Sequence, residues 1–205
     1  GAPACAACDA FFRIAADACA CVRQLADHDA VARKYMREAG HLAGVMRTLR
    51  CAVGSLEAAP AARARLEELA VSLLDIIAVF VGQAHGDARA EAGLSAQALL
   101  QRAYVVEAVC LEALPSASVG LATKLRMVDL LEATLSAADT GLLQCLAPAP
   151  PGASALDKLV ELTLTGATPL QLSARLERLL GRVLARSAGL WATLADGMEA
   201  ALALS

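Results

Sequence analysis

The sequence predicts an all-α protein, an antiparallel helical bundle of about six to seven helices, several of them long. Of the 205 residues, 58% are hydrophobic, and alanine and leucine, both strong helix formers, make up about two-fifths of the chain. Apolar residues recur at helical spacing nearly throughout, and no segment alternates apolar and polar residues as a half-buried strand does. Long amphipathic helices joined by short loops pack as antiparallel bundles.

The first helix is expected over residues 4–24 and carries two neighbouring apolar stripes. One stripe, in steps of three and four residues, consists of Cys5, Cys8, Phe12, Ala15, Cys19 and Val22. The second stripe lies beside it and consists of Phe11, Ile14, Ala18, Cys21 and Leu25. Charged side chains occupy the opposite side, so this helix has a broad apolar face.

A second long helix is expected over residues 29–57. Its buried face is marked by Tyr35, Ala39, Leu42, Met46, Leu49, Val53 and Leu56. Pro60 suits the first turn of a third helix, which continues to about residue 83. Backbone N–H groups in the first turn have no partner within the helix, so the N–H that proline lacks is not needed there. Residues 86–93 are polar with glycine at both ends, which predicts a loop.

Four further helices follow in the second half of the chain. Ser154, with Asp157 three residues later, is a good start for one of them, and Thr168, followed by Pro169 and Gln171, is a good start for the last. The four helices are expected over about residues 95–114, 118–145, 154–166 and 168–204.

We expect one domain overall. Residues 1–146 should form the main helical bundle of about five helices. Residues 147–153, Ala-Pro-Ala-Pro-Pro-Gly-Ala, are the clearest linker because proline and glycine interrupt helices. Residues 154–205 are then expected to supply C-terminal helices that pack on the same bundle.

Composition and charge exclude several classes of function. A net charge of −3, a pI near 5.6 and 3% aromatic residues argue against nucleic-acid binding. Mean hydropathy is high at +0.54, but prolines or Asp75 interrupt the most apolar stretches, so no transmembrane segment is predicted. No signal peptide is visible, and we expect an intracellular, cytoplasmic protein. Because the chain begins with Gly1 and not with Met, a segment of a larger protein is one interpretation.

The cysteines and histidines do not form a recognisable metal or redox site. Cys5 and Cys8 share a helical face with Cys19, but Cys19 lies about 21 Å further along a continuous helix, too far for one zinc ion. We therefore interpret these cysteines, together with Cys21, as small apolar side chains in a reduced, buried state. No metal or other cofactor is expected.

Asp75 is the most unusual residue, because nearly all its neighbours in the sequence are apolar. Burying a carboxylate without a partner is very unfavourable. We expect Asp75 to be paired with a basic or hydroxyl group, for example Arg102, or to lie on a narrow exposed strip. The functional alternative is a buried polar anchor within a ligand cavity or a partner groove.

Two groups of basic residues are candidate partner-binding surfaces. The first consists of Arg33, Lys34, Arg37 and Arg47 on the second helix. The second consists of Arg175, Arg178, Arg182 and Arg186 on the last helix. Each is either a solvated helix face, paired with acidic residues of a neighbouring helix, or a docking surface. A docking surface would bind an acidic protein segment or, as the less favoured partner, anionic lipid head groups.

The favoured function is a non-catalytic scaffold or interaction module that binds another protein or a second copy of itself. The alternative is a carrier that holds an apolar ligand or lipid between its helices. An enzyme is the least favoured class, because no glycine-rich phosphate motif or nucleophile elbow is present. The carboxylate pairs Asp129/Glu132 and Asp157/Glu161 resemble ordinary surface pairs.

Overall fold

The computed structural model describes residues 6–38, 40–82, 96–136, 154–165 and 168–186, and within these ranges every regular element is helical. The predicted all-α fold is therefore confirmed. The α-helices are α1 (Ala6–His28), α2 (Ala30–Glu38), α3 (His41–Ala58), α4 (Arg63–Gly82), α6 (Ala96–Ala108), α7 (Leu121–Ser136), α9 (Ala155–Leu164) and α10 (Leu170–Leu184). A single 3₁₀ turn (Pro60–Ala62) precedes α4, and a π-helical turn (Val109–Ala113) continues α6.

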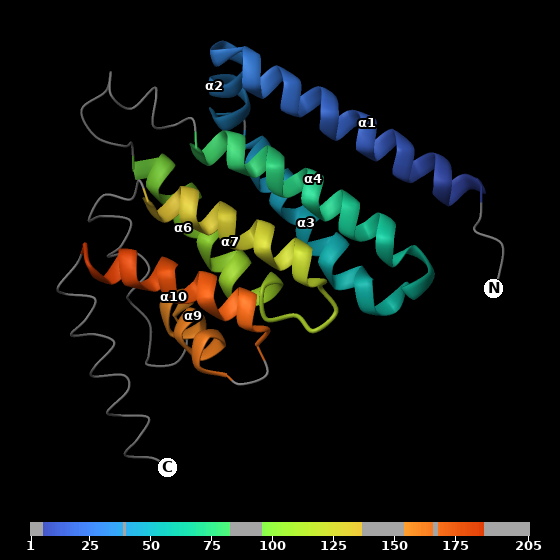
Figure 1. The fold of residues 1–205 in the computed structure, drawn as a ribbon. Coiled ribbons are helices and arrows are strands. Elements are labelled where there is room, and N and C mark those ends of the chain that lie inside the picture. Colours follow the sequence, from blue (N-terminus) through green and yellow to red (C-terminus); the bar gives the residue numbers. More distant parts are fainter. Residues whose placement is uncertain (1–5, 39, 83–95, 137–153, 166–167, 187–205) are drawn as a thin grey trace.

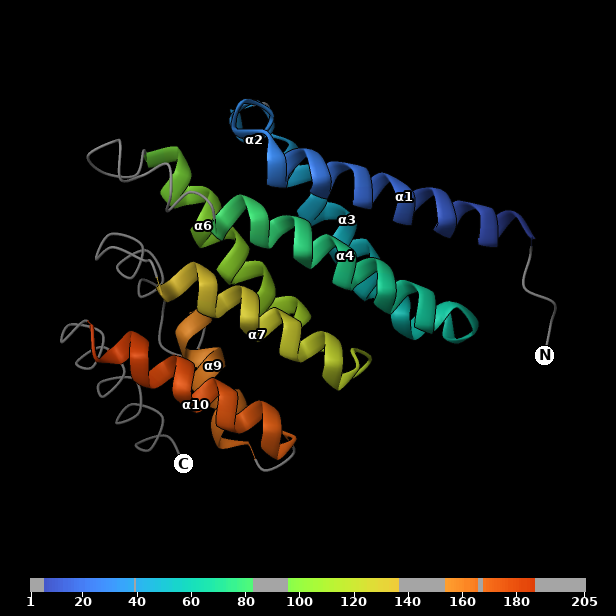
Figure 2. The ribbon, with the colours of Figure 1, turned by 45° about the horizontal axis from the view of Figure 1, so that its top comes forward.

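The helices are arranged in two layers (Figures 1 and 2). One layer contains α1, α4, α7 and α10 in that order, and successive helices of this layer contact one another. Behind it lie α3, α6 and α9, which pair with α4, α7 and α10 and run in the opposite direction. Each pair is an antiparallel hairpin, as expected for long helices joined by short connections.

One hydrophobic cluster runs through both layers. It extends from Ala26 of α1 through the buried faces of α3, α4, α6 and α7 to Leu184 of α10. Leu156 and Leu159 of α9 belong to the same cluster. The helices after the predicted linker therefore pack on the same core as those before it, while the linker itself, 147–153, lies outside the described residues.

The predicted helix over 29–57 is two helices. Gly40 has a φ of 72°, in the left-handed region that glycine adopts without the steric penalty of a Cβ atom. The chain turns there between α2 and α3. Tyr35 was predicted to lie on the buried face, but it is exposed, because α2 no longer continues the direction of α3.

One of the two predicted helix caps is present, and Asp29 supplies a further cap that was not predicted. The Asp29 carboxylate accepts hydrogen bonds from the backbone N–H groups of Val31 and Ala32 at the start of α2. Ser154 and Asp157 form a reciprocal capping box at α9. The prediction for Thr168 is wrong, because α10 begins one residue later, with Pro169 in the capping position and no side-chain cap.

Candidate functional site

Asp75 joins three helices of the front layer. Its carboxylate accepts a hydrogen bond from Arg23 Nη1 of α1 at 3.0 Å and another from Arg126 Nη2 of α7 at 2.8 Å. The Asp75 side chain retains 20% of its exposure, so it lies at the edge of the core. The predicted basic partner is present, and it holds α4 to both neighbours.

Arg102, the partner suggested by the sequence, has another role. It is buried on α6, and its Nη2 atom donates to the backbone carbonyl of Val81 at 3.3 Å, near the end of α4. The two guanidinium groups that bind Asp75 come from helices far away in the sequence, so no local pattern identified them.

The arginines of α10 are partly engaged within the bundle. Arg175 forms an ion pair with Asp129 of α7, and Arg182 forms one with Glu132 of the same helix. Arg186 donates to the backbone carbonyl of Leu135 at 3.5 Å. Arg178 is exposed, and its Nε donates only within its own helix, to the carbonyl of Ala174.

The first basic group does not form one helix face. Arg33, Lys34 and Arg37 belong to α2, whereas Arg47 is exposed on α3 beyond the turn at Gly40. The side chains of the three α2 residues lie outside what the structure describes. The predicted continuous surface is therefore divided between two helices.

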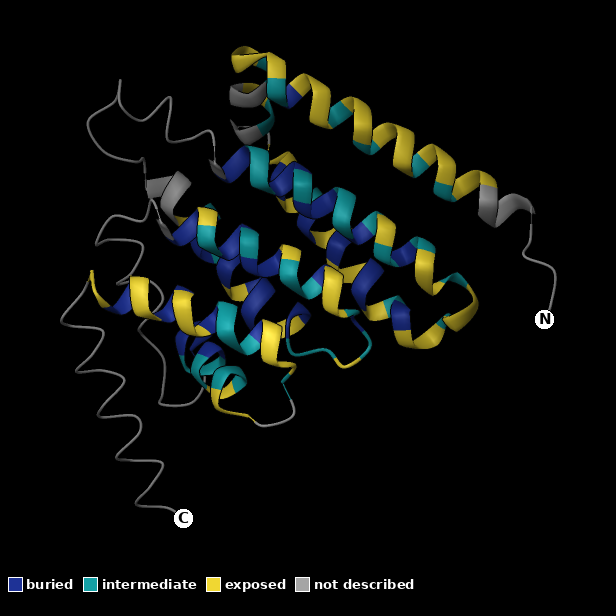
Figure 3. Cartoon of the chain, in the orientation of Figure 1, coloured by how far each residue is buried: buried dark blue, intermediate teal, exposed yellow. Residues whose placement is uncertain are grey.

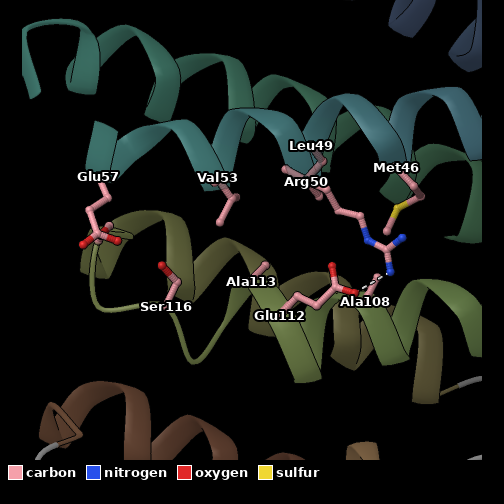
Figure 4. A pocket seen from close by; sticks show the side chains of 11 residues that line it. Met46, Leu49, Arg50, Val53, Glu57, Ala108, Glu112, Ala113 and Ser116 are labelled. Atoms are coloured by element: carbon pink, nitrogen blue, oxygen red, sulfur yellow. Dashed lines mark hydrogen bonds and ion pairs between the residues drawn. The ribbon is translucent and has the colours of Figure 1, made fainter. Parts of the chain in front are cut away.

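A shallow groove of about 250 Å³ lies between α3 and the end of α6 (Figure 4). At one end, Arg50 reaches from α3 to Glu112 at 2.6 Å and donates to the Tyr104 hydroxyl at 2.9 Å. At the other end lie Glu57 and Ser116. The apolar part of the lining is contributed by Met46, Leu49, Val53, Ala108 and Ala113.

A row of exposed apolar residues lies along α1. Its first stripe, from Phe12 to Val22, packs against the core with Ala26, which is completely buried; these residues are called the covered stripe. The second stripe is exposed at every position and is called the open stripe: Phe11, Ile14, Ala18, Cys21 and Leu25. Figure 3 shows the exposed colouring along almost the whole length of α1.

The exposed fractions on the open stripe are large. Phe11 is 62% exposed, Ile14 68% and Leu25 52%. On α2, Val31 and Tyr35 are exposed as well. The two stripes lie about 100° apart around the α1 axis, and α4 covers only one of them. The sequence predicted both stripes but not which one the bundle leaves open.

The cysteines occupy different environments. Cys110 is completely buried, and this burial raises the pKa of its thiol well above the ordinary value. Partial burial also raises the pKa of Cys19. Cys21 and Cys51 are exposed, so the expectation of a buried Cys21 is wrong. Cys5 and Cys8 lie outside the residues whose side chains the structure describes.

Comparisons with known proteins found no matching family model, no matching curated protein and no matching solved structure. Within the described ranges, no group of three or more His, Cys, Asp and Glu side chains is placed to hold a metal ion. No described helix combines the length and the hydrophobicity needed to cross a membrane.

Proposed function

We propose that the protein is a non-catalytic interaction module that binds a protein partner through the open stripe of α1. One observation carries this proposal: Phe11, Ile14 and Leu25, all large and apolar, are more than half exposed on one helix. Monomeric proteins rarely expose contiguous apolar patches larger than a few hundred Å², and the largest such patch on a monomer is often functional.

The dimensions of the open stripe fit a helical partner. From Phe11 to Leu25 the stripe is about 21 Å long at 1.5 Å per residue. Its steps of three and four residues match the spacing with which two helices interlock their side chains. A partner helix of about four turns with its own apolar face would cover it.

Polar groups elsewhere in the front layer support a structural role for the bundle. The carboxylates of Asp75, Asp129 and Glu132 each bind an arginine of a neighbouring helix. These ion pairs leave the acidic residues engaged in holding helices together. They therefore favour the role of a rigid scaffold that presents α1, and they argue against a site for acid–base chemistry.

The proposal is tested by site-specific photo-crosslinking in cells that express the protein. A photoreactive phenylalanine analogue is placed at Phe11, on the open stripe, or at Ala20, which is exposed on the polar side of α1. We expect discrete protein adducts from position 11 and none from position 20. No adduct at position 11, or the same adducts at both positions, would refute the proposal.

The carrier function has less support. The groove beside α3 measures about 250 Å³, which is below the roughly 300–1,000 Å³ of typical small-molecule sites. Its Arg50–Glu112 ion pair also places two charges at one end. Native mass spectrometry of the purified protein that shows a stoichiometric bound lipid would reverse this preference.

A further inference from the structure

We propose that the partner on the open stripe is a second copy of this chain, with the two α1 helices packed antiparallel about a two-fold axis near Ala18. This inference rests on the proposed function and specifies the occupant of the same surface. Three properties of α1 support it: its place at the end of a layer, the symmetry of its stripe and the area it exposes.

The open stripe is uncovered because α1 lies at the end of the front layer. Both α4 and α7 pack against a neighbour on each side in the front layer, whereas α1, at the end of that layer, packs mainly against α4 among the described helices. Stacked helical proteins keep an end helix in water by giving it a polar outer surface. In α1 the broad apolar face continues past the part that α4 covers, so the layer ends on an apolar surface.

The open stripe is close to symmetric about its centre. Phe11 and Leu25 each lie seven residues from Ala18, and Ile14 and Cys21 lie on either side between them. An antiparallel copy therefore places Phe11 opposite Leu25 of the other copy, while the two Ala18 residues meet at the crossing point. The small alanine side chain at this point lets the two helix axes approach closely. Both copies use the same surface, as a two-fold interface requires.

The flank of the stripe is compatible with this pairing. Arg13 and Asp17 are exposed and four residues apart on α1, the spacing at which opposite charges interact favourably. Each copy therefore brings a locally neutral flank to the interface. No large net charge has to be brought together.

The exposed area matches a reversible dimer. With Phe11, Ile14 and Leu25 more than half exposed, the five residues of the stripe offer roughly 450 Å² per copy, or about 900 Å² for two. A total of this size lies in the range of weak, transient interfaces, which bury less than about 1,200 Å². An interface of this size predicts a dimer that dissociates on dilution.

The first test is sedimentation equilibrium of the full chain over a wide range of concentrations. We compare the wild type with Ile14→Glu on the open stripe and with Ala20→Glu, which adds the same charge to the polar side of the same helix. Circular dichroism checks that helicity is unchanged, which we expect because both positions are exposed.

We expect the average mass of the wild type to rise with concentration from one copy toward two. Ile14→Glu should weaken the association more than about tenfold, and Ala20→Glu should leave it unchanged. A wild type that stays monomeric throughout, or equal dimerisation of both variants, would overturn the proposal.

A second test locates the two-fold axis. Ala18→Cys should give a disulfide-linked dimer under mild oxidation, because the two Ala18 positions face each other, whereas Ala20→Cys should give none above the wild-type background. Equal crosslinking from both positions would contradict the antiparallel arrangement.

Together, sedimentation and photo-crosslinking distinguish a failure of the dimer proposal from a failure of the proposed function. If the wild type is monomeric but photo-crosslinking at Phe11 captures a different protein, the second copy is excluded and the proposed function stands. If position 11 captures nothing, both proposals fail.

Discussion

Two neighbouring helices, α4 and α1, show how the same kind of sequence has different consequences in different places. Both are long and rich in apolar residues. Helix α4 lies between α1, α3 and α7, and the single carboxylate in its apolar run is paired on both sides. Helix α1 lies at the end of the layer, and half of its apolar face has no cover in the described structure. Position in the fold, more than hydrophobicity, decides which face is left for a partner.

The largest expected difference is in cysteine reactivity, between the open stripe of α1 and the buried core at the end of α6. Maleimide reacts with the thiolate, and burial raises the pKa of Cys110, so this thiol stays protonated and covered at pH 8. Cys21 on the open stripe is exposed. We expect Cys21 to react at least about a thousandfold faster than Cys110, which reacts only when the core opens. Peptide mass spectrometry after timed labelling of dilute protein measures both rates, and comparable rates would contradict the described packing.

Shortening an apolar side chain should lower the free energy of unfolding much more in the core of α4 than on the open stripe of α1. Ile77 of α4 is completely buried, and Ile77→Ala should lower the free energy of unfolding by about 2–5 kcal/mol. Ile14→Ala on the open stripe should change it by less than about 0.5 kcal/mol in dilute protein. Urea unfolding followed by circular dichroism measures both. Equal losses would mean that α1 buries Ile14 in the monomer.

The ion-paired carboxylate of Asp75 in α4 should contribute less to the free energy of unfolding than the buried Ile77 side chain does. Asp75→Asn removes the negative charge shared by Arg23 and Arg126, whose side chains remain about half exposed. We expect a loss of about 1 kcal/mol in the free energy of unfolding, less at high salt. The control is Asp27→Asn, which removes the negative charge that lies 3.8 Å from Arg23 within α1. If both variants unfold at the same urea concentration, Asp75 does not hold the layer together.

Reversing the charge of an α10 arginine should have the smallest effect on stability. Arg182→Glu places a second negative charge beside Glu132 and should cost up to about 1 kcal/mol, whereas Arg178→Glu should be close to neutral because Arg178 has no ion pair within the described residues. If this basic group were a docking surface, reversing the charges of Arg178 and Arg182 would weaken partner binding without lowering thermal stability. Thermal unfolding of the two single variants decides between these expectations, and a larger loss for Arg178→Glu would contradict the structure.

Local patterns predicted the features that depend on local physics. Helical spacing predicted the all-α fold, and the cap of Ser154 with Asp157 followed from two residues three apart. A basic partner for Asp75 followed from the free energy of burying a charge. Each of these expectations needs only the neighbours of a residue along the chain, or a general rule about burial.

The remaining features depend on contacts between distant segments. The turn at Gly40 divided a continuous apolar pattern that looked like one helix. Arg23 and Arg126 come to Asp75 from 52 and 51 residues away, and Arg182 meets Glu132 across 50 residues. The two stripes of α1 are equally apolar in sequence, and only the packing of α4 shows which is covered.

Self-association through the open stripe is tested by the labelling rate of Cys21 at increasing protein concentration, with Cys51 as the internal control. Both thiols are exposed, but Cys21 lies on the open stripe and Cys51 lies on α3. We expect Cys21 to react more slowly as copies associate, while Cys51 keeps its rate. If the two rates stay constant, or fall together, the open stripe is not the surface on which copies of this protein meet.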